Sequence, residues 1–149
     1  MTVTDFIAKW GGVTGGAERA NLGQFINDLC QALGLPLPEP AEGGVLSDYQ
    51  FEGPVQGGGV GGNTGAIDLY KRGCFVLEGK QSKLSPAQKE QAQLFDAPES
   101  APAAPSGARY DKLMRDALAQ AKRYAVNLPA DHPWPPFLIV CDVGRAFEL

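Results

Sequence analysis

Cysteine and histidine are scarce in this chain of 149 residues, and their scarcity excludes several kinds of site. The three cysteines, Cys30, Cys74 and Cys141, form no Cys-x-x-Cys pair, and each lies among apolar neighbours, which predicts small buried hydrophobic side chains. His132 is the only histidine, so a structural zinc site would have too few soft ligands. A Ser-His-Asp hydrolase would have to take His132 from a proline-rich loop, which argues against that mechanism.

Long apolar runs and a targeting signal are also lacking. No apolar stretch reaches about 18 residues, the length of a membrane span, and residues 1–7 have neither a basic start nor a signal-like apolar segment. These absences favour a cytoplasmic protein without a membrane partner. With 44% hydrophobic and 20% charged residues, the composition is that of one globular domain, residues 1–149, with its own core.

An excess of positive charge is missing as well, because the net charge is −4. The charges are nevertheless unevenly distributed: ten of the thirteen basic residues lie between Lys71 and Arg123, while seven acidic residues lie within the first 52 positions. A basic face formed by the second half of the chain and ordinary solvated helix faces both fit this distribution. Charge alone does not decide between them.

The first half of the chain contains one helical pattern and one short strand pattern. Apolar residues repeat at three- and four-residue steps over residues 17–33, and Gly34 predicts the end of this helix. The apolar positions are Leu22, Phe25, Ile26, Leu29, Cys30 and Leu33. Glu18 lies on the same stripe; a first-turn carboxylate favoured by the helix dipole explains it, and so does a role in a site. Residues 49–55 predict a strand that ends near Pro54.

Residues 57–65 are dense in glycine, and three of these glycines match the pattern G-x-G-x-x-G. A dinucleotide-binding loop requires a helix directly afterwards, whereas here a second strand is predicted to follow. We therefore interpret the segment as a flexible turn. A hydrolase that binds a nucleotide or another small molecule through this loop is the weaker alternative.

A β-hairpin is predicted next, with strands at residues 66–71 and 74–80 joined around Arg72 and Gly73. Residues 81–107 are rich in Ala, Pro, Ser and Gln, which predicts an insertion or loop with a helical turn at residues 86–95.

The remaining residues predict a second helix over 109–128 and a strand covered on both faces over 137–142. Residues 145–149 begin a further strand pattern, and we therefore expect the chain to be the N-terminal piece of a longer protein. The order helix, strand, hairpin, helix, strand is typical of an α/β fold with a mixed sheet.

Three charged side chains interrupt the otherwise apolar hairpin: Asp68, Glu78 and Lys80. Burying such groups is costly unless they are paired or hold a metal. Glu78 and Lys80 are two positions apart on one strand, so they point to the same face. Nine residues separate Asp68 from Glu78, so the two carboxylates share a face only if the loop has an odd residue count or a bulge intervenes. A three-residue loop, Arg72 to Cys74, meets this condition.

The chemistry of these three residues suits a divalent cation. Two carboxylates, with the carbonyl of Gly79, match the oxygen ligands of Mg²⁺ or Mn²⁺, which keep waters in their other positions. Such a metal lowers the pKa of a bound water and neutralises charge on a phosphate oxygen. Lys80 can then hold the nucleophilic water or stabilise the charge of the transition state. A surface hairpin with incidental acids and a weak Glu78–Lys80 ion pair is the alternative.

The spacing of Asp68 and Glu78-x-Lys80 resembles the motif of the PD-(D/E)xK nucleases, and the predicted element order is similar to the core of that fold. Further short sequence segments resemble the N-terminal domain of MmeI-type fused restriction–modification enzymes. They are Glu18-Arg19-Ala20, Asn27-Asp28-Leu29-Cys30, Tyr49-Gln50-Phe51-Glu52, Ile67-Asp68-Leu69-Tyr70-Lys71, the Glu78/Lys80 pair and Val140-Cys141-Asp142. The resemblance covers nearly the whole chain apart from the Ala/Pro-rich insertion.

This resemblance implies an α/β fold with a PD-(D/E)xK restriction-endonuclease-like core, a mixed β-sheet flanked by helices. It also implies roles for single residues: Asp68 and Glu78 as metal ligands, Lys80 as the catalytic lysine, and Glu18 as the acidic helix residue that completes the site. Gly79 would add its carbonyl and is otherwise expected to be neutral.

Three other positions are compared with the family pattern less directly. Ile67 stands where the nominal proline of the motif would be, at a position that varies widely. Gln120 and Tyr124 resemble polar residues of the second helix.

The function implied by the resemblance is a Mg²⁺- or Mn²⁺-dependent DNA endonuclease domain of a restriction–modification or phage-defence system. Its expected partners are double-stranded DNA, methyltransferase and target-recognition domains of the same polypeptide, and a second copy for cutting both strands. The acidic net charge predicts weak DNA affinity for the domain alone. A catalytically silent DNA-binding or assembly module with the same fold is the competing hypothesis.

Overall fold

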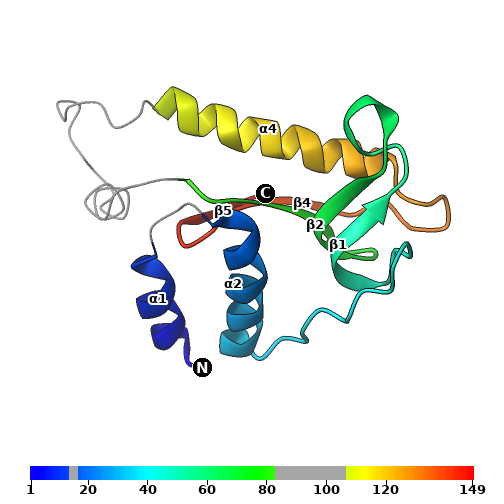
Figure 1. Cartoon of the computed structure of the whole chain (residues 1–149). Coiled ribbons are helices and arrows are strands. Elements are labelled where there is room, and N and C mark those ends of the chain that lie inside the picture. Colours follow the sequence, from blue (N-terminus) through cyan, green and yellow to red (C-terminus); the bar gives the residue numbers. More distant parts are fainter. Residues whose placement is uncertain (14–16, 83–106) are drawn as a thin grey trace.

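The computed structural model describes residues 1–13, 17–82 and 107–149, and these residues form an α/β fold (Figure 1). Three α-helices accompany a five-stranded mixed sheet within the described ranges. The helices are α1 (Val3–Gly11), α2 (Glu18–Leu33) and α4 (Gly107–Val126). The strands are β1 (Tyr49–Val55), β2 (Gly65–Lys71), β3 (Phe75–Lys80), β4 (Phe137–Asp142) and β5 (Ala146–Glu148), and a short 3₁₀ turn, η1 (Val60–Gly62), precedes β2.

The strands lie in the order β1-β2-β3-β4-β5, and every neighbouring pair is antiparallel except β3 and β4. A parallel pair needs a crossover connection, and α4 lies on the path between these two strands. Helix α4 covers one face of the sheet, while α1 and α2 lie on the other (Figure 1). Strand β3 is therefore enclosed on both faces, and four of its six residues are buried.

Each face of the sheet has its own hydrophobic cluster. On the side of α2, the buried residues include Leu22, Phe25, Leu69, Leu77 and Cys141. On the side of α4, they form two groups that include Val55, Ile67, Tyr70, Val76 and Tyr124 in one and Met114, Ala117 and Val140 in the other. Val140 and Cys141 are neighbours in β4 yet belong to opposite faces, which confirms the prediction of a strand covered on both sides.

Both predicted helices are confirmed within two residues at each end. Helix α2 ends at Gly34, which adopts the left-handed conformation (φ 66°) and donates its N–H to the carbonyls of Cys30 and Gln31. Helix α4 was predicted two residues further along the chain than it lies. The predicted insertion overlaps residues 83–106, and the helical turn at 86–95 lies wholly outside the described residues.

Helix α1 was not predicted, although its start carries a clear local signal. The Thr2 hydroxyl accepts from the N–H of Asp5, and the Asp5 carboxylate accepts from the N–H of Thr2, which is a complete capping box. Trp10 near the helix end is buried, and its Nε1 donates to Asp28 of α2 at 2.9 Å. Lys9 also donates to Asp28, at 2.6 Å, so a buried carboxylate joins α1 to α2.

The cysteines behave largely as predicted. Cys30 and Cys141 are buried, Cys74 in the hairpin loop is half-buried, and all three are free thiols. In the part of the chain that the structure describes, no helix is long and apolar enough to cross a membrane.

Candidate functional site

The β2–β3 hairpin closes through a three-residue loop, the odd loop length that a shared face for Asp68 and Glu78 needs. Lys71 pairs with Phe75, and Arg72, Gly73 and Cys74 form the turn. Gly73 has φ 66°, a left-handed conformation that glycine adopts at little cost and that three-residue hairpin loops use. The register runs as far as Leu69 opposite Leu77, so Asp68 and Glu78 are the first residues of the two strands beyond the last pair.

The two strands separate where these carboxylates lie. The β2–β3 pairing ends at Leu69 and Leu77, whereas β3 continues to pair with β4 as far as Lys80 and Asp142. In place of a backbone carbonyl of β2, the carboxylate of Asp68 accepts the N–H of Gly79 at 2.8 Å. Asp68 thus occupies the fork between two diverging strands, with its other oxygen available for a ligand.

The chain also switches faces at Asp68. In a regular strand Ile67 and Leu69 would share a face, but Ile67 packs on the side of α4 and Leu69 on the side of α2. Strand β1 switches with it, because its pairing with β2 skips Glu52 and Asp68 between the pairs Phe51–Leu69 and Gly53–Ile67. Glu52 has φ 51°, an uncommon value for a residue with a side chain.

Glu78 is the most unusual polar residue of the fold. Its side chain is fully buried, and both carboxylate oxygens lack a hydrogen-bond partner among the residues that the structure describes. Burial raises the pKa of Glu78 to about 9, the neighbouring charge of Asp68 acts in the same direction, and the charge of Lys80 opposes both. A buried carboxylate without partners requires either a proton or a cation.

Burial also raises the pKa of Asp68 above its usual range. The hydrogen bond from Gly79 and the charge of Lys80 oppose this rise, while Glu52 adds to it. Two carboxyl groups of raised pKa, both influenced by the charge of one lysine, are typical of a functional site rather than of a surface hairpin.

A cavity of about 400 Å³ opens at the fork. We call it the fork cavity; its lining residues are Glu18, Arg19, Leu22, Gly23, Phe51, Glu52, Asp68, Lys80 and Gln120. Lys80 Nζ lies 3.8 Å from Glu18 Oε1, and Glu18 Oε2 accepts the N–H of Gln81 at 3.0 Å. The structure therefore brings Asp68, Lys80 and Glu18 to one cavity, whereas Glu78 is buried beside it and does not line it.

The lack of a side chain at Gly79 matters for packing. A Cβ atom added to it would clash with the Cδ atoms of Leu22, a buried residue of α2. A larger residue would therefore force Leu22 to shift where α2 packs on β3 and brings Glu18 to the fork cavity.

Gln120 and Tyr124 of α4 differ in position. Gln120 lines the fork cavity, and its Nε2 donates to the Tyr124 hydroxyl at 3.1 Å. Tyr124 is buried in the cluster that contains Val55 and Ile67. Arg19 and Glu52, which also line the cavity, were not identified from the sequence as site residues. The left-handed backbone of Glu52 gives no sequence signal, since glycine usually occupies such positions.

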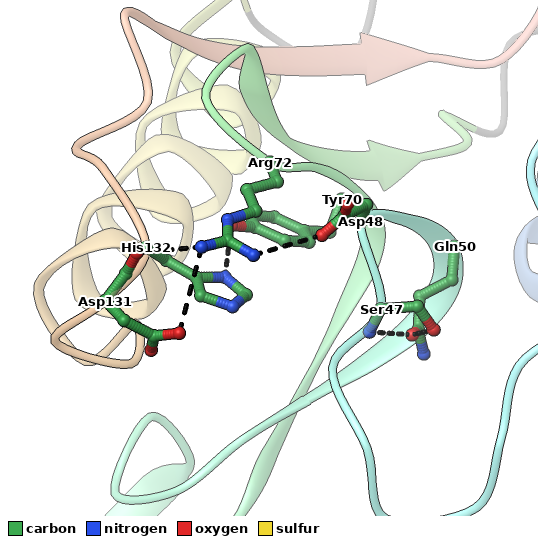
Figure 2. Close-up of polar contacts among 7 residues, drawn as sticks. All are labelled: Ser47, Asp48, Gln50, Tyr70, Arg72, Asp131 and His132. Carbon is green, nitrogen blue, oxygen red and sulfur yellow. Dashed lines mark hydrogen bonds and ion pairs between the residues drawn. The ribbon is translucent and has the colours of Figure 1, made fainter.

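A second polar cluster ties the hairpin turn to the connector before β4 (Figure 2). Arg72 reaches Asp48 at 3.3 Å and both the carbonyl and the carboxylate of Asp131, at 2.9 and 3.7 Å. His132 Nδ1 is hydrogen-bonded to the buried Tyr70 hydroxyl at 2.8 Å. His132 thus has a structural contact with Tyr70.

The glycine-rich segment leads through η1 into β2, so the helix of a dinucleotide-binding loop does not follow it. Arg123 Nε of α4 donates to the carbonyl of Gly58 at 2.9 Å. This contact attaches the segment to the end of α4.

Comparison with known proteins agrees with the resemblance seen in the sequence. No curated protein and no solved structure matches the chain. The family model described as MmeI, N-terminal domain matches residues 1–149, the whole chain. With its fork of two carboxylates and a lysine, the chain belongs to the family of MmeI N-terminal domains.

Proposed function

We propose that this chain is a Mg²⁺- or Mn²⁺-dependent DNA endonuclease domain with a PD-(D/E)xK core, which acts in restriction–modification or phage defence. Membership of the MmeI N-terminal family supports the relation to restriction–modification. The observation that carries the nuclease proposal is that Asp68, Glu78 and Lys80 gather at the fork, where neither oxygen of the buried Glu78 has a hydrogen-bond partner among the described residues.

The donor atoms at the fork fit a hard divalent cation. Asp68 and Glu78 would hold it, with the Gly79 carbonyl as a third oxygen. Among the described residues, no group of three or more Asp, Glu, His or Cys side chains is arranged to hold a metal. Two carboxylates are nevertheless enough for Mg²⁺, which commonly keeps several waters. When bound, the cation would lower the pKa of a coordinated water and neutralise charge on a phosphate oxygen.

Lys80 and Glu18 have separate roles in this proposal. The Lys80 side chain is 18% exposed and lines the fork cavity, so its ammonium group can orient the attacking water or stabilise the negative charge of the phosphate in the transition state. Glu18 holds Lys80 from one side and accepts the N–H of Gln81. It thereby fixes the end of β3, whose last residue is Lys80.

The arrangement of elements supports the PD-(D/E)xK assignment. A helix precedes a mixed sheet, a hairpin carries the charged residues, and a further helix leads into a parallel strand. We further propose that the chain is the single N-terminal domain of a longer polypeptide, whose methyltransferase and target-recognition domains select the DNA. A second copy would cut the second strand.

The test is a cleavage assay on supercoiled plasmid DNA. We expect the chain to nick or linearise the plasmid in Mg²⁺ or Mn²⁺. Cleavage should stop when EDTA removes the metal. Asp68→Asn, purified in the same way, controls for a contaminating nuclease and should be inactive, whereas Asp111→Asn, at an exposed position of α4, should cut normally. Equal products from the chain and from Asp68→Asn would reject the proposal and favour a catalytically silent binding or assembly module.

A further inference from the structure

The fork cavity contains two cations, and each faces a carboxylate. Lys80 is 3.8 Å from Glu18, and Arg19 is 3.5 Å from Glu52. The two pairs differ in access: the side chain of Lys80 is 18% exposed, whereas that of Arg19 is 85% exposed. Arg19 is therefore the cation of this cavity that a large ligand outside it can reach first.

A contribution to the stability of the fold does not account for the Arg19–Glu52 ion pair. Exposed ion pairs contribute little to stability, and the Glu52 side chain is 48% exposed. Glu52 is also the only non-glycine residue with positive φ in the described ranges, a conformation that is unfavourable for a residue with a side chain. A strained backbone that supports a weak surface pair suggests that the position of the guanidinium matters for function.

We propose that Arg19 binds a phosphate of the DNA backbone at the mouth of the fork cavity, and that Glu52 is the positioning residue that orients its guanidinium before DNA arrives. This inference rests on the proposed nuclease function and adds a substrate contact to it. The planar guanidinium group binds phosphate through two parallel hydrogen bonds, which a lysine cannot provide.

The charges that line the fork cavity also favour a contact between Arg19 and a DNA phosphate. Glu18, Glu52 and Asp68 give the cavity three carboxylates against two cations, so a DNA phosphate is repelled unless a cation at the mouth receives it. Because the Arg19–Glu52 pair is exposed and weak, a phosphate can replace Glu52 as the partner of Arg19 without a large penalty.

Binding of a fluorescent DNA duplex, measured by anisotropy in Ca²⁺ instead of Mg²⁺, tests the contact without depending on cleavage. We expect Arg19→Ala to weaken binding roughly tenfold at low salt and to reduce the slope of log affinity against log salt by about 0.9, the value for one phosphate contact. Arg19→Lys should keep the slope but recover only part of the affinity. Arg115→Ala is the matched control, because Arg115 is exposed on α4 in a different depression.

The role of Glu52 is tested by a double-mutant cycle. If Glu52 positions Arg19, the effect of Arg19→Ala is smaller in the Glu52→Gln background than in the native chain. If Glu52→Gln tightens binding and Arg19→Ala has the same effect in both backgrounds, Glu52 only repels DNA and its positioning role is rejected.

Two results would overturn the phosphate contact. One is an unchanged salt slope in Arg19→Ala, and the other is a native chain that fails to bind the duplex even at low salt. Either can occur while the plasmid assay still shows Mg²⁺-dependent cutting, so this inference can fail without the nuclease proposal. Conversely, an effect of Arg19→Ala on binding by a chain that cuts nothing would keep the contact and reject the nuclease.

Discussion

Replacing Glu78 by glutamine is expected to make the metal-free protein more stable at pH 7, by on the order of 3 kcal/mol, while removing its binding of divalent metal. The stability gain follows from the raised pKa of Glu78, about 9 in the fold against an ordinary value of 4.5. Between these two pH values the folded protein retains a proton on Glu78 that the unfolded chain releases. Stability must therefore fall as the pH rises through this window.

The magnitude follows from the same linkage. Each pH unit in the window corresponds to about 1.4 kcal/mol, so the interval from 4.5 to 7 corresponds to about 3 kcal/mol. Glutamine stays neutral and similar in shape, so the variant should not show this loss. Denaturant unfolding at pH 5, 7 and 8 in EDTA measures the free energy of unfolding, and the difference between the two proteins should grow with pH.

The control and the metal titration make the Glu78 experiment specific. Glu148→Gln, at an exposed position of β5, should leave stability unchanged at every pH. Adding Mn²⁺ should raise the melting temperature of the native chain, because a ligand that binds only the folded state stabilises it, and should not affect Glu78→Gln. A Glu78→Gln variant with the stability of the native chain at pH 8 would contradict the raised pKa of the buried Glu78 carboxyl group.

Replacing Lys80 by alanine is expected to lower the rate of DNA cleavage in Mg²⁺ by about 10²- to 10³-fold, the usual loss when a group that stabilises the charge of a transition state is removed. Lys80 also lowers the pKa of both Asp68 and Glu78 through its charge. Both carboxyl groups must be ionised to hold a metal. The variant should therefore need a higher pH than the native chain to reach its own maximal rate.

This shift in the pH–rate profile separates a role in the site from simple misfolding. Lys112→Ala removes an exposed lysine that pairs with Asp116 on α4, and it should leave both the rate and the profile unchanged. Similar cleavage by Lys80→Ala and the native chain, with the same pH dependence, would show that Lys80 takes no part in the reaction.

Local rules predicted the hairpin and the two longer helices. The loop length stayed open, since only an odd loop lets Asp68 and Glu78 share a face; the structure has the three-residue loop, and Gly73 supplies the left-handed residue that it uses. The apolar stripe and Gly34 similarly located α2. These signals depend on neighbouring residues alone, which is why sequence reasoning could use them.

Other features depend on contacts between distant segments. The face switch at Asp68 arises from the joint distortion of β1 and β2 at Glu52, and regular alternation cannot anticipate it. The requirement for Gly79 arises from the approach of Leu22, 57 positions away in the chain. Helix α1 had a local signal in its capping box, but the buried partner of Trp10 lies on α2.

The most direct test of the central claim is a crystal structure of the chain soaked in Mn²⁺, with anomalous scattering used to locate the metal. We expect a manganese peak at the fork, in contact with carboxylate oxygens of both Asp68 and Glu78. A fork without manganese, or with the carboxylates on opposite faces of the hairpin, would contradict the metal site and the nuclease mechanism built on it.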